Sequence, residues 1–230
     1  MLVDQVKSGA LPPVDQRVPR PPWVVTRFAG DDGPGRPGGQ LNMLVASARD
    51  TRLMTIYSYT RLIVYDDKFK LRPDILESYE VKEDREFTFR LRAGHKWSDG
   101  EPFTADDVVF FFNDIVENKD LHPDVTAEWG VNVKAEKIDD THVKLSFDEP
   151  FPGLLTYMAT SGSYFAPFAP KHHFAKYHLT YNPKADEEAK AAGFESWVKE
   201  FNTFYNVWKD AETLTPHALT VPTLESHIIE

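Results

Sequence analysis

Three glycines in this sequence have the spacing of a phosphate-binding loop. Gly33, Gly35 and Gly38 match the G-x-G-x-x-G pattern that receives a pyrophosphate at the start of a helix. That loop must follow a strand and open a helix, whereas here two prolines interrupt it and two aspartates precede it. An anionic phosphate would meet those carboxylates first, so we expect no nucleotide cofactor.

Three histidines, His172, His173 and His178, lie close together in the sequence and are candidate metal ligands. His173 and His178 are five positions apart rather than four, so they do not share one helical face well. No Glu stands between them as it does in zinc proteases. Surface histidines are therefore the simpler interpretation, and we predict no metal site, with metal binding kept as an alternative.

The sequence offers no nucleophile in a catalytic setting. It contains no cysteine, which removes thiol nucleophiles and thiolate metal sites. The nucleophile elbow Gly-x-Ser-x-Gly does not occur, and the acid pair Asp106 and Asp107 is interpreted as favourable charge at a helix N-terminus. We expect no catalytic residues, no cofactor and no enzymatic activity.

The composition of the chain narrows the class of protein further. The 230 residues carry 26 Lys and Arg against 36 Asp and Glu, a formal net charge of −10 that argues against binding nucleic acid. A hydrophobic share of 41% is typical of a globular protein. No apolar run approaches the roughly 18 residues of a membrane span, and the first residues lack the basic and apolar regions of an export signal.

Periodicity predicts a mixed α/β fold, with a small, largely antiparallel sheet in the middle third and helices concentrated after Pro150. Residues 86–92 alternate between apolar and polar, as in a strand with one buried face. A hairpin is expected around Asp139 and Asp140. The expected strands are residues 23–28, 41–47, 61–65, 86–92, 131–137 and 142–147.

One helix has a strong start signal at Thr104, with Asp107 placed to complete a capping box. Its apolar residues fall at helical spacing and on more than one side, which predicts a helix buried between two surfaces: Val108, Phe111, Phe112 and Ile115, widened by Val109, Phe110 and Val116. Short helices are also expected at 154–158 and 186–192, the second ended by Gly193. An aromatic stripe predicts a helix over 194–208 that turns Trp197, Phe201 and Trp208 toward protein.

Between the strand and the capped helix, residues 91–108 form an unusual segment. The strand ends at Gly94, Ser98 to Gly100 make a tight turn, and Trp97 is placed to pack the corner. We predict that this corner stabilises the fold and does not bind a ligand.

The same corner closely resembles the family 5 extracellular solute-binding proteins, the peptide, oligosaccharide and nickel receptors of ABC importers. Upstream, residues 62–66 and 71–80 resemble the family as well, with Ile75 and Tyr79 as conservative departures. The opening residues 9–19 and the segments 213–216 and 222–224 resemble a long-form subgroup. The residues of the corner that carry the resemblance are 87–92, Gly94, 97–100, Pro102, Thr104, Ala105, Asp107 and Val108.

The resemblance implies a fold of the type II periplasmic-binding-protein kind, with two lobes joined by a hinge and an extra domain. It implies that residues 1–48 open lobe I, 49–149 form the extra domain with its largely antiparallel sheet, and 150–230 return to lobe I as a helical segment. Because family members are considerably longer, the chain is expected to be a truncated N-terminal portion without lobe II.

The function implied is capture of a small solute, a peptide or an oligosaccharide, in the periplasm and its delivery to an ABC permease, by a monomer that binds no nucleic acid. A metal or haem receptor of the same fold is the alternative, and a mixed α/β hydrolase or oxidoreductase is a more distant one. The loop 29–39 is expected to line the solute. The resemblance further implies ligand contacts from two separate segments, Tyr57, Ser58 and Tyr59 and then Ser161, Ser163, Tyr164 and Phe165.

Overall fold

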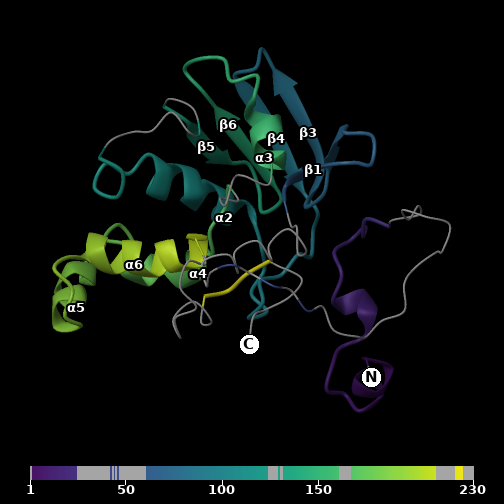
Figure 1. Cartoon of the computed structure of the whole chain (residues 1–230), viewed down its shortest axis with the longest axis horizontal. Coiled ribbons are helices and arrows are strands. Elements are labelled where there is room, and N and C mark those ends of the chain that lie inside the picture. Colours follow the sequence, from purple (N-terminus) through teal and green to yellow (C-terminus); the bar gives the residue numbers. More distant parts are fainter. Residues whose placement is uncertain are drawn as a thin grey trace.

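The computed structural model describes residues 2–24, 42, 44, 46, 61–123, 129, 132–160, 167–210 and 221–224. The strands predicted at 23–28 and 41–47 lie almost entirely outside these residues. Within the described residues, two antiparallel sheets lie above a group of helices (Figure 1). Residues 2–24, called the N-terminal arm, extend to one side. No described helix is long and apolar enough to cross a membrane.

The first elements are helix α1 (Leu2–Lys7), the 3-10 helix η1 (Val14–Gln16) and six strands interrupted by one helical run. The strands are β1 (Ile63–Tyr65), β2 (Leu71–Pro73), β3 (Leu76–Lys82), β4 (Glu86–Leu91), β5 (Lys134–Lys137) and β6 (His142–Ser146). The helical run between β4 and β5 is α2 (Ala105–Val109) followed by the π-helix η3 (Phe110–Val116). The later helices are α3 (Leu154–Ala159), α4 (Lys171–Phe174), the 3-10 helix η5 (Ala175–Tyr177), α5 (Ala185–Ala191) and α6 (Trp197–Asp210).

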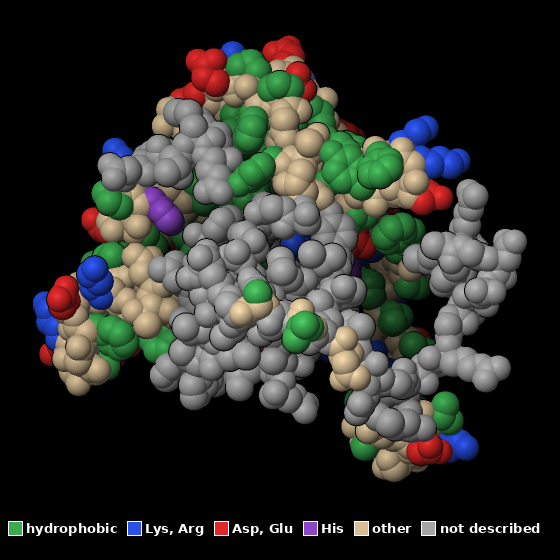
Figure 2. Space-filling view, in the orientation of Figure 1, with side chains coloured by type: hydrophobic (Ala, Val, Ile, Leu, Met, Phe, Trp, Pro, Cys, Tyr) green, Lys and Arg blue, Asp and Glu red, His purple; other side chains and the backbone are tan. Residues whose placement is uncertain are grey.

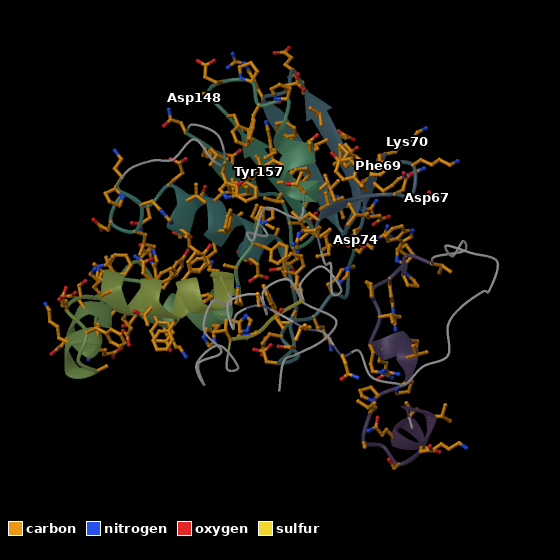
Figure 3. All side chains as sticks on the ribbon, in the orientation of Figure 1. Asp67, Phe69, Lys70, Asp74, Asp148 and Tyr157 are labelled. Atoms are coloured by element: carbon orange, nitrogen blue, oxygen red, sulfur yellow. The ribbon has the colours of Figure 1, made fainter. Side chains whose placement is uncertain are left out.

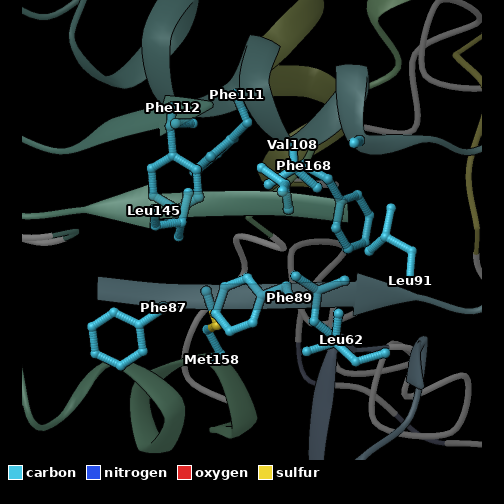
Figure 4. Packing of buried hydrophobic residues seen from close by; sticks show 14 of the residues in the cluster. Leu62, Phe87, Phe89, Leu91, Val108, Phe111, Phe112, Leu145, Met158 and Phe168 are labelled. Atoms are coloured by element: carbon cyan, nitrogen blue, oxygen red, sulfur yellow. The ribbon is translucent and has the colours of Figure 1, made fainter. Parts of the chain in front are cut away.

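The main sheet has the strand order β3-β4-β6-β5 and is antiparallel throughout. Phe87 and Phe89 of β4 lie opposite Leu145 and Val143 of β6, and all four side chains are buried. Figure 4 shows this apolar face between the helical run and Met158 of α3. The predicted alternation is confirmed, and β5 and β6 form the expected hairpin, although β5 begins only at residue 134.

The open edge of β5 is covered by the side chains of Asn113 in η3 and of Glu117, the residue that follows η3. The amide of Asn113 donates to the carbonyl oxygen of Ala135 at 2.8 Å and accepts from its N–H at 2.9 Å. Glu117 accepts from the N–H of Val133 at 2.9 Å. These bonds occupy backbone groups that would otherwise be available to a further strand, which protects the edge.

The helical run α2–η3 begins as predicted and then departs from prediction. Thr104 and Asp107 form the expected capping box at its start. From Phe110 onward the helix is π-helical rather than α-helical, and the N–H of Glu117 bonds the carbonyl oxygen of Phe112 five residues back. This wider turn allows Asn113 to reach the edge of β5 while its aromatic neighbours stay buried.

The same run is buried on two sides, as its sequence predicted. Val108, Phe111 and Phe112 join the first core with the sheet, whereas Phe110 and Ile115 join a second core with α4, α5 and α6. The run therefore forms the partition between the sheet and the C-terminal helices.

Helix α5 ends at Ala191, and Gly193 terminates it as predicted, with a φ of +91° and the N–H of Phe194 bonded to the carbonyl oxygen of Ala189. The prediction that the next helix begins at residue 194 is wrong. Helix α6 begins at Trp197, because Asp186 accepts the N–H of Trp197 and Ser196 caps the first turn.

Within α6, Trp197 and Phe201 are buried, as predicted from the aromatic stripe. They pack in the second core with Phe174 of α4 and with Tyr205. The backbone of α6 includes Trp208, but the side chain of Trp208 lies outside the described part of the chain.

The strand-turn-helix corner is packed by Trp97, whose side chain is only 2% exposed. Its ring makes edge contacts with Phe103 and Phe168, at centroid distances of 5.7 and 5.9 Å. Gly100, at a φ of +95°, donates its N–H to the carbonyl oxygen of Trp97 and closes the predicted turn. The structural role predicted for this corner agrees with these contacts.

Replacing Trp97 by alanine is expected to lower the free energy of unfolding by about 3–5 kcal/mol, because the change leaves a cavity between two buried phenylalanines. Thr104→Ala should cost about 1 kcal/mol through loss of the cap. Denaturant unfolding measures both. The matched control is Trp23→Ala, since Trp23 is 48% exposed. Equal losses for the two tryptophan variants would contradict the role given to Trp97.

Candidate functional site

None of the predicted ligand contacts lies within the described residues. Tyr57, Ser58 and Tyr59 precede the described segment that begins at residue 61, and Ser161, Ser163, Tyr164 and Phe165 lie between residues 160 and 167. The loop 29–39 with its three spaced glycines also lies outside the described part. What the structure does place is the chain that enters and leaves each of these segments.

Described residues that border two of the predicted ligand segments belong to one buried cluster. Leu62 and Ile63 follow residues 57–59, and Met158 and Ala159 precede residues 161–165. All four are buried in the first core, where α3 contacts β1 and β2. Leu62 and Met158 lie on the same side of β4 in Figure 4. Sequence positions about a hundred residues apart are thus anchored at one place.

A half-buried carboxylate, that of Asp74, holds the backbone at Arg61, where the described chain resumes. One Asp74 oxygen accepts from the N–H of Arg61 at 3.4 Å, and the carbonyl oxygen of Arg61 accepts from the N–H of Ile75 at 3.1 Å. Burial raises the pKa of Asp74, against the lowering effect of the Arg61 bond and of the charge of Arg92. Figure 3 shows Asp74 below the exposed turn that carries Phe69.

The side chain of Arg92 joins two further parts of the chain. Its Nε donates to the carbonyl oxygen of Asp74 at 2.8 Å, and its Nη1 donates to the carbonyl oxygen of Pro21 at 3.2 Å. Beside it, Arg20 and Ala93 form an antiparallel bridge with an N–H to carbonyl distance of 2.8 Å. The N-terminal arm is therefore fastened to the end of β4.

Sequence reasoning missed both Asp74 and Arg92. Arg92 falls on the polar side of the alternation over residues 86–92, and Asp74 lies within the segment 71–80 that resembles the family. Arg92 bonds residues 18 and 71 positions away, and the Asp74 carboxylate bonds one 13 positions away, so no local pattern predicts these contacts.

Next to Arg92, the ring of His95 is largely buried. Burial, and secondarily the positive charge of Arg92, lower the pKa of His95 to about 4. Its Nε2 is buried with no hydrogen-bond partner among the described residues. The neutral form of His95 is therefore strongly favoured in the folded chain at neutral pH.

The three clustered histidines each have separate surroundings. His172 pairs through Nε2 with Asp99 at 2.8 Å, whereas the ring of His173 packs against Phe174 and Tyr177. His178 is buried, and its Nε2 lies 3.0 Å from the carbonyl oxygen of Asp114. The interpretation of all three as surface histidines is wrong for His178, which packs between Phe110 and α6. Within the described ranges, no group of three or more His, Asp or Glu residues is placed to hold a metal ion.

The surface carries charges of both signs. In Figure 2, basic and acidic side chains lie together at the tip of the main sheet, at the β1–β2 turn and over α5. The most exposed aromatic residue among those described is Phe69, which is 87% exposed and lies in that turn at a φ of +56°. The described residues on this face form no continuous basic surface of the kind that phosphate backbones require.

The fold and sequence match a known family. The profile described as bacterial extracellular solute-binding proteins, family 5 Middle, matches residues 70–209. A solved structure of an oligopeptide-binding protein, OppA, superposes with a TM-score of 0.77 and 32% identity, covering 98% of this chain and 34% of that one. This chain belongs to the family 5 extracellular solute-binding proteins, and its mixed α/β fold is that of the OppA type.

Two curated relatives support the assignment. The periplasmic alpha-galactoside-binding protein of Rhizobium meliloti is 32% identical over 76% of this chain and 28% of its own length. A Brucella ovis protein named as an ABC transporter peptide-binding protein is 35% identical over 54% of this chain and 23% of its own length. The chain spans roughly a quarter of the length of these relatives. The family and these relatives are solute-binding proteins.

The lowered pKa of His95 predicts that the free energy of unfolding depends on pH. An unfolded histidine takes up its proton near pH 6.5 and the folded one only near 4, so the unfolded state binds more protons in that window. The free energy of unfolding should therefore fall as the pH drops from 6.5 to 4. His95→Gln should reduce this fall by up to about 1.4 kcal/mol per pH unit. Parallel stability curves for the two proteins, measured by denaturant unfolding, would contradict the burial of a neutral His95.

Proposed function

We propose that the chain is part of the substrate-binding component of an ABC importer, which captures a solute in the periplasm and delivers it to a permease. The observation that carries this proposal is the family match over residues 70–209, together with relatives named for binding alpha-galactosides and peptides. In such receptors two lobes close around the solute and exclude water, and the reaction is binding rather than bond-making.

Within this receptor, successive parts of the chain belong to different domains. Residues 1–48 open lobe I, 49–149 form the extra domain and 150–230 return to lobe I. The antiparallel main sheet falls entirely within the second of these ranges, and α3 to α6 fall within the third. The extra domain and the returning segment share the first core through Met158 and Phe168.

The proposed solute contacts are Tyr57, Ser58 and Tyr59 with Ser161, Ser163, Tyr164 and Phe165. Hydroxyl groups and aromatic rings suit both a peptide backbone and a sugar. Both solutes carry hydrogen-bonding groups for the hydroxyls and apolar faces against which the rings can pack. The anchoring of Leu62 and Met158 in one cluster supports a single wall built from both segments. Two solute classes follow from the relatives, oligosaccharides containing alpha-galactosides and short peptides.

A titration of the 230-residue chain, followed by amide NMR shifts, tests this function. Raffinose and trialanine serve as the two probes. Buffer with a neutral osmolyte in place of the probe controls for shifts caused by the bulk solution. Because one wall supplies about half the contacts of a micromolar receptor, we expect saturable shifts with a dissociation constant in roughly the millimolar range for one probe. The shifts should map to residues 57–59 and 161–165.

Two results would contradict the proposal. Absence of any saturable shift with either probe at the highest soluble concentrations would show that this chain supplies no solute wall. Micromolar binding would show that a complete pocket lies within these residues, and that the site is not shared with another lobe.

A further inference from the structure

We propose that His178 is an acid-sensitive latch, whose neutral ring ties the π-helix η3 to the turn before α5 and whose protonation opens that tie. His178 is 1% exposed and directly follows η5. Its ring packs against Phe110 of η3 and against Trp197 and Phe201 of α6. The latch does not involve the solute, so this inference is independent of the proposed function.

The Nδ1 atom of the ring accepts a hydrogen bond from its own turn. The N–H of Thr180 donates to Nδ1 at 3.2 Å. The N–H groups of Tyr181 and Asn182 both donate to the carbonyl oxygen of His178 at 2.9 Å, which closes the turn. Because a backbone N–H is always a donor, Nδ1 carries no proton in this geometry.

The Nε2 atom faces a carbonyl oxygen of η3. It lies 3.0 Å from the carbonyl oxygen of Asp114, which can only accept. In an α-helix that oxygen would bond the N–H of Asn118, four residues on, but this N–H donates instead to the carbonyl oxygen of Ile115 at 3.4 Å. The departure from α-helical bonding therefore leaves the Asp114 carbonyl to the ring, whose Nε2 must supply the proton.

A third contact, from the side chain of Asn118, opposes this assignment and is outweighed. Its Nδ2 lies 3.1 Å from Nε2, and its Oδ1 accepts the N–H groups of Asp120 and Leu121 at 2.9 and 3.2 Å, which fixes the orientation of the amide. A proton on Nε2 satisfies both backbone partners and opposes the amide. A proton on Nδ1 would satisfy the amide and oppose both backbone partners. The geometry thus selects the neutral ring with its proton on Nε2.

Protonation of the ring conflicts with this arrangement, because a second proton would go to Nδ1 and face the N–H of Thr180. Burial lowers the pKa of His178 from 6.5, although the carbonyl bond and the negative charges of Asp114 and Asp120 favour the charged form. From α6 the ring faces only apolar rings among the described contacts, and Tyr181 donates its hydroxyl to the Asp114 carboxylate at 2.7 Å.

The sign of the pH dependence follows from this lowered pKa. Just below pH 6.5 the unfolded chain takes up a proton at residue 178 that the folded chain does not. The latch therefore stabilises the fold fully above that pH and weakens as the pH falls. Phe110 and Ile115 of η3 pack in the second core with α4, α5 and α6, so acid should loosen this core before the main sheet.

Nitrogen-15 NMR of the 230-residue chain at neutral pH tests the protonation state directly. His178 is assigned through contacts of its ring protons with those of Trp197. We expect Nδ1 to resonate as an unprotonated nitrogen and Nε2 as a protonated one. A proton on Nδ1 at neutral pH, in the neutral or the charged ring, would overturn the inference without any variant having to fold.

Hydrogen exchange measured by mass spectrometry tests the latch, with labelling times scaled for the intrinsic pH dependence of exchange. Between about pH 7.5 and about pH 5.5, exchange in peptides covering residues 114–122 and 177–182 should rise by up to about tenfold, the effect of one pH unit below 6.5. Peptides covering β4 and β6 should keep their protection. Absence of this rise, or an equal rise in β4 and β6, would overturn the latch.

Two variants that cannot take up the proton complete the test. His178→Gln can still donate to the Asp114 carbonyl, and His178→Asn can still accept from Thr180, so each keeps one half of the tie. Both should lose the rise at acid pH. The matched control is His173→Gln, because burial also lowers the pKa of His173, to about 4, while its ring packs against Phe174 and Tyr177. The control should keep the rise, and an undiminished rise in either His178 variant would contradict the latch.

Discussion

The buried carboxylate of Asp107 is the contact on which the arrangement of the described chain most depends. It accepts the N–H of Thr104 at 2.9 Å, the indole N–H of Trp97 at 3.3 Å and the N–H of Lys171 at 3.0 Å. Burial raises its pKa, and these three donors oppose that shift. A buried carboxylate without such donors would be costly, so the three segments that supply them are constrained to meet at one point.

That constraint places the helical run α2–η3 between two cores. On one side the run covers the apolar face of the main sheet, and on the other it covers the helices α4 to α6. The sheet then carries two further attachments at the end of β4, the packing of Leu62 against the α3 region and the contacts of Arg92 with the N-terminal arm. Leu62 and Met158, which border two of the proposed solute-binding segments in the sequence, are both held in the first core.

Features with a local cause could be predicted from the sequence. The alternation of Phe87 and Phe89, the Thr104 cap and the Gly193 terminus each depend on residues within a few positions, and the structure confirms them. The helix start at Trp197 and the contacts of Arg92 depend on partners farther along the chain, and no local pattern contains them. The family resemblance supplied the candidate solute contacts, and these stay predictions because they lie outside the described residues.

The central claim is that one solute-binding wall is assembled from two segments about a hundred positions apart. Photoaffinity labelling tests it most directly, with raffinose and trialanine each carrying a diazirine, followed by mapping of the labelled peptides and competition with the unlabelled compound. The account predicts that one probe labels both residues 57–59 and residues 161–165, and that excess unlabelled compound suppresses both labels together. Competable labelling confined to another part of the chain, such as the histidine region 172–178, would contradict it.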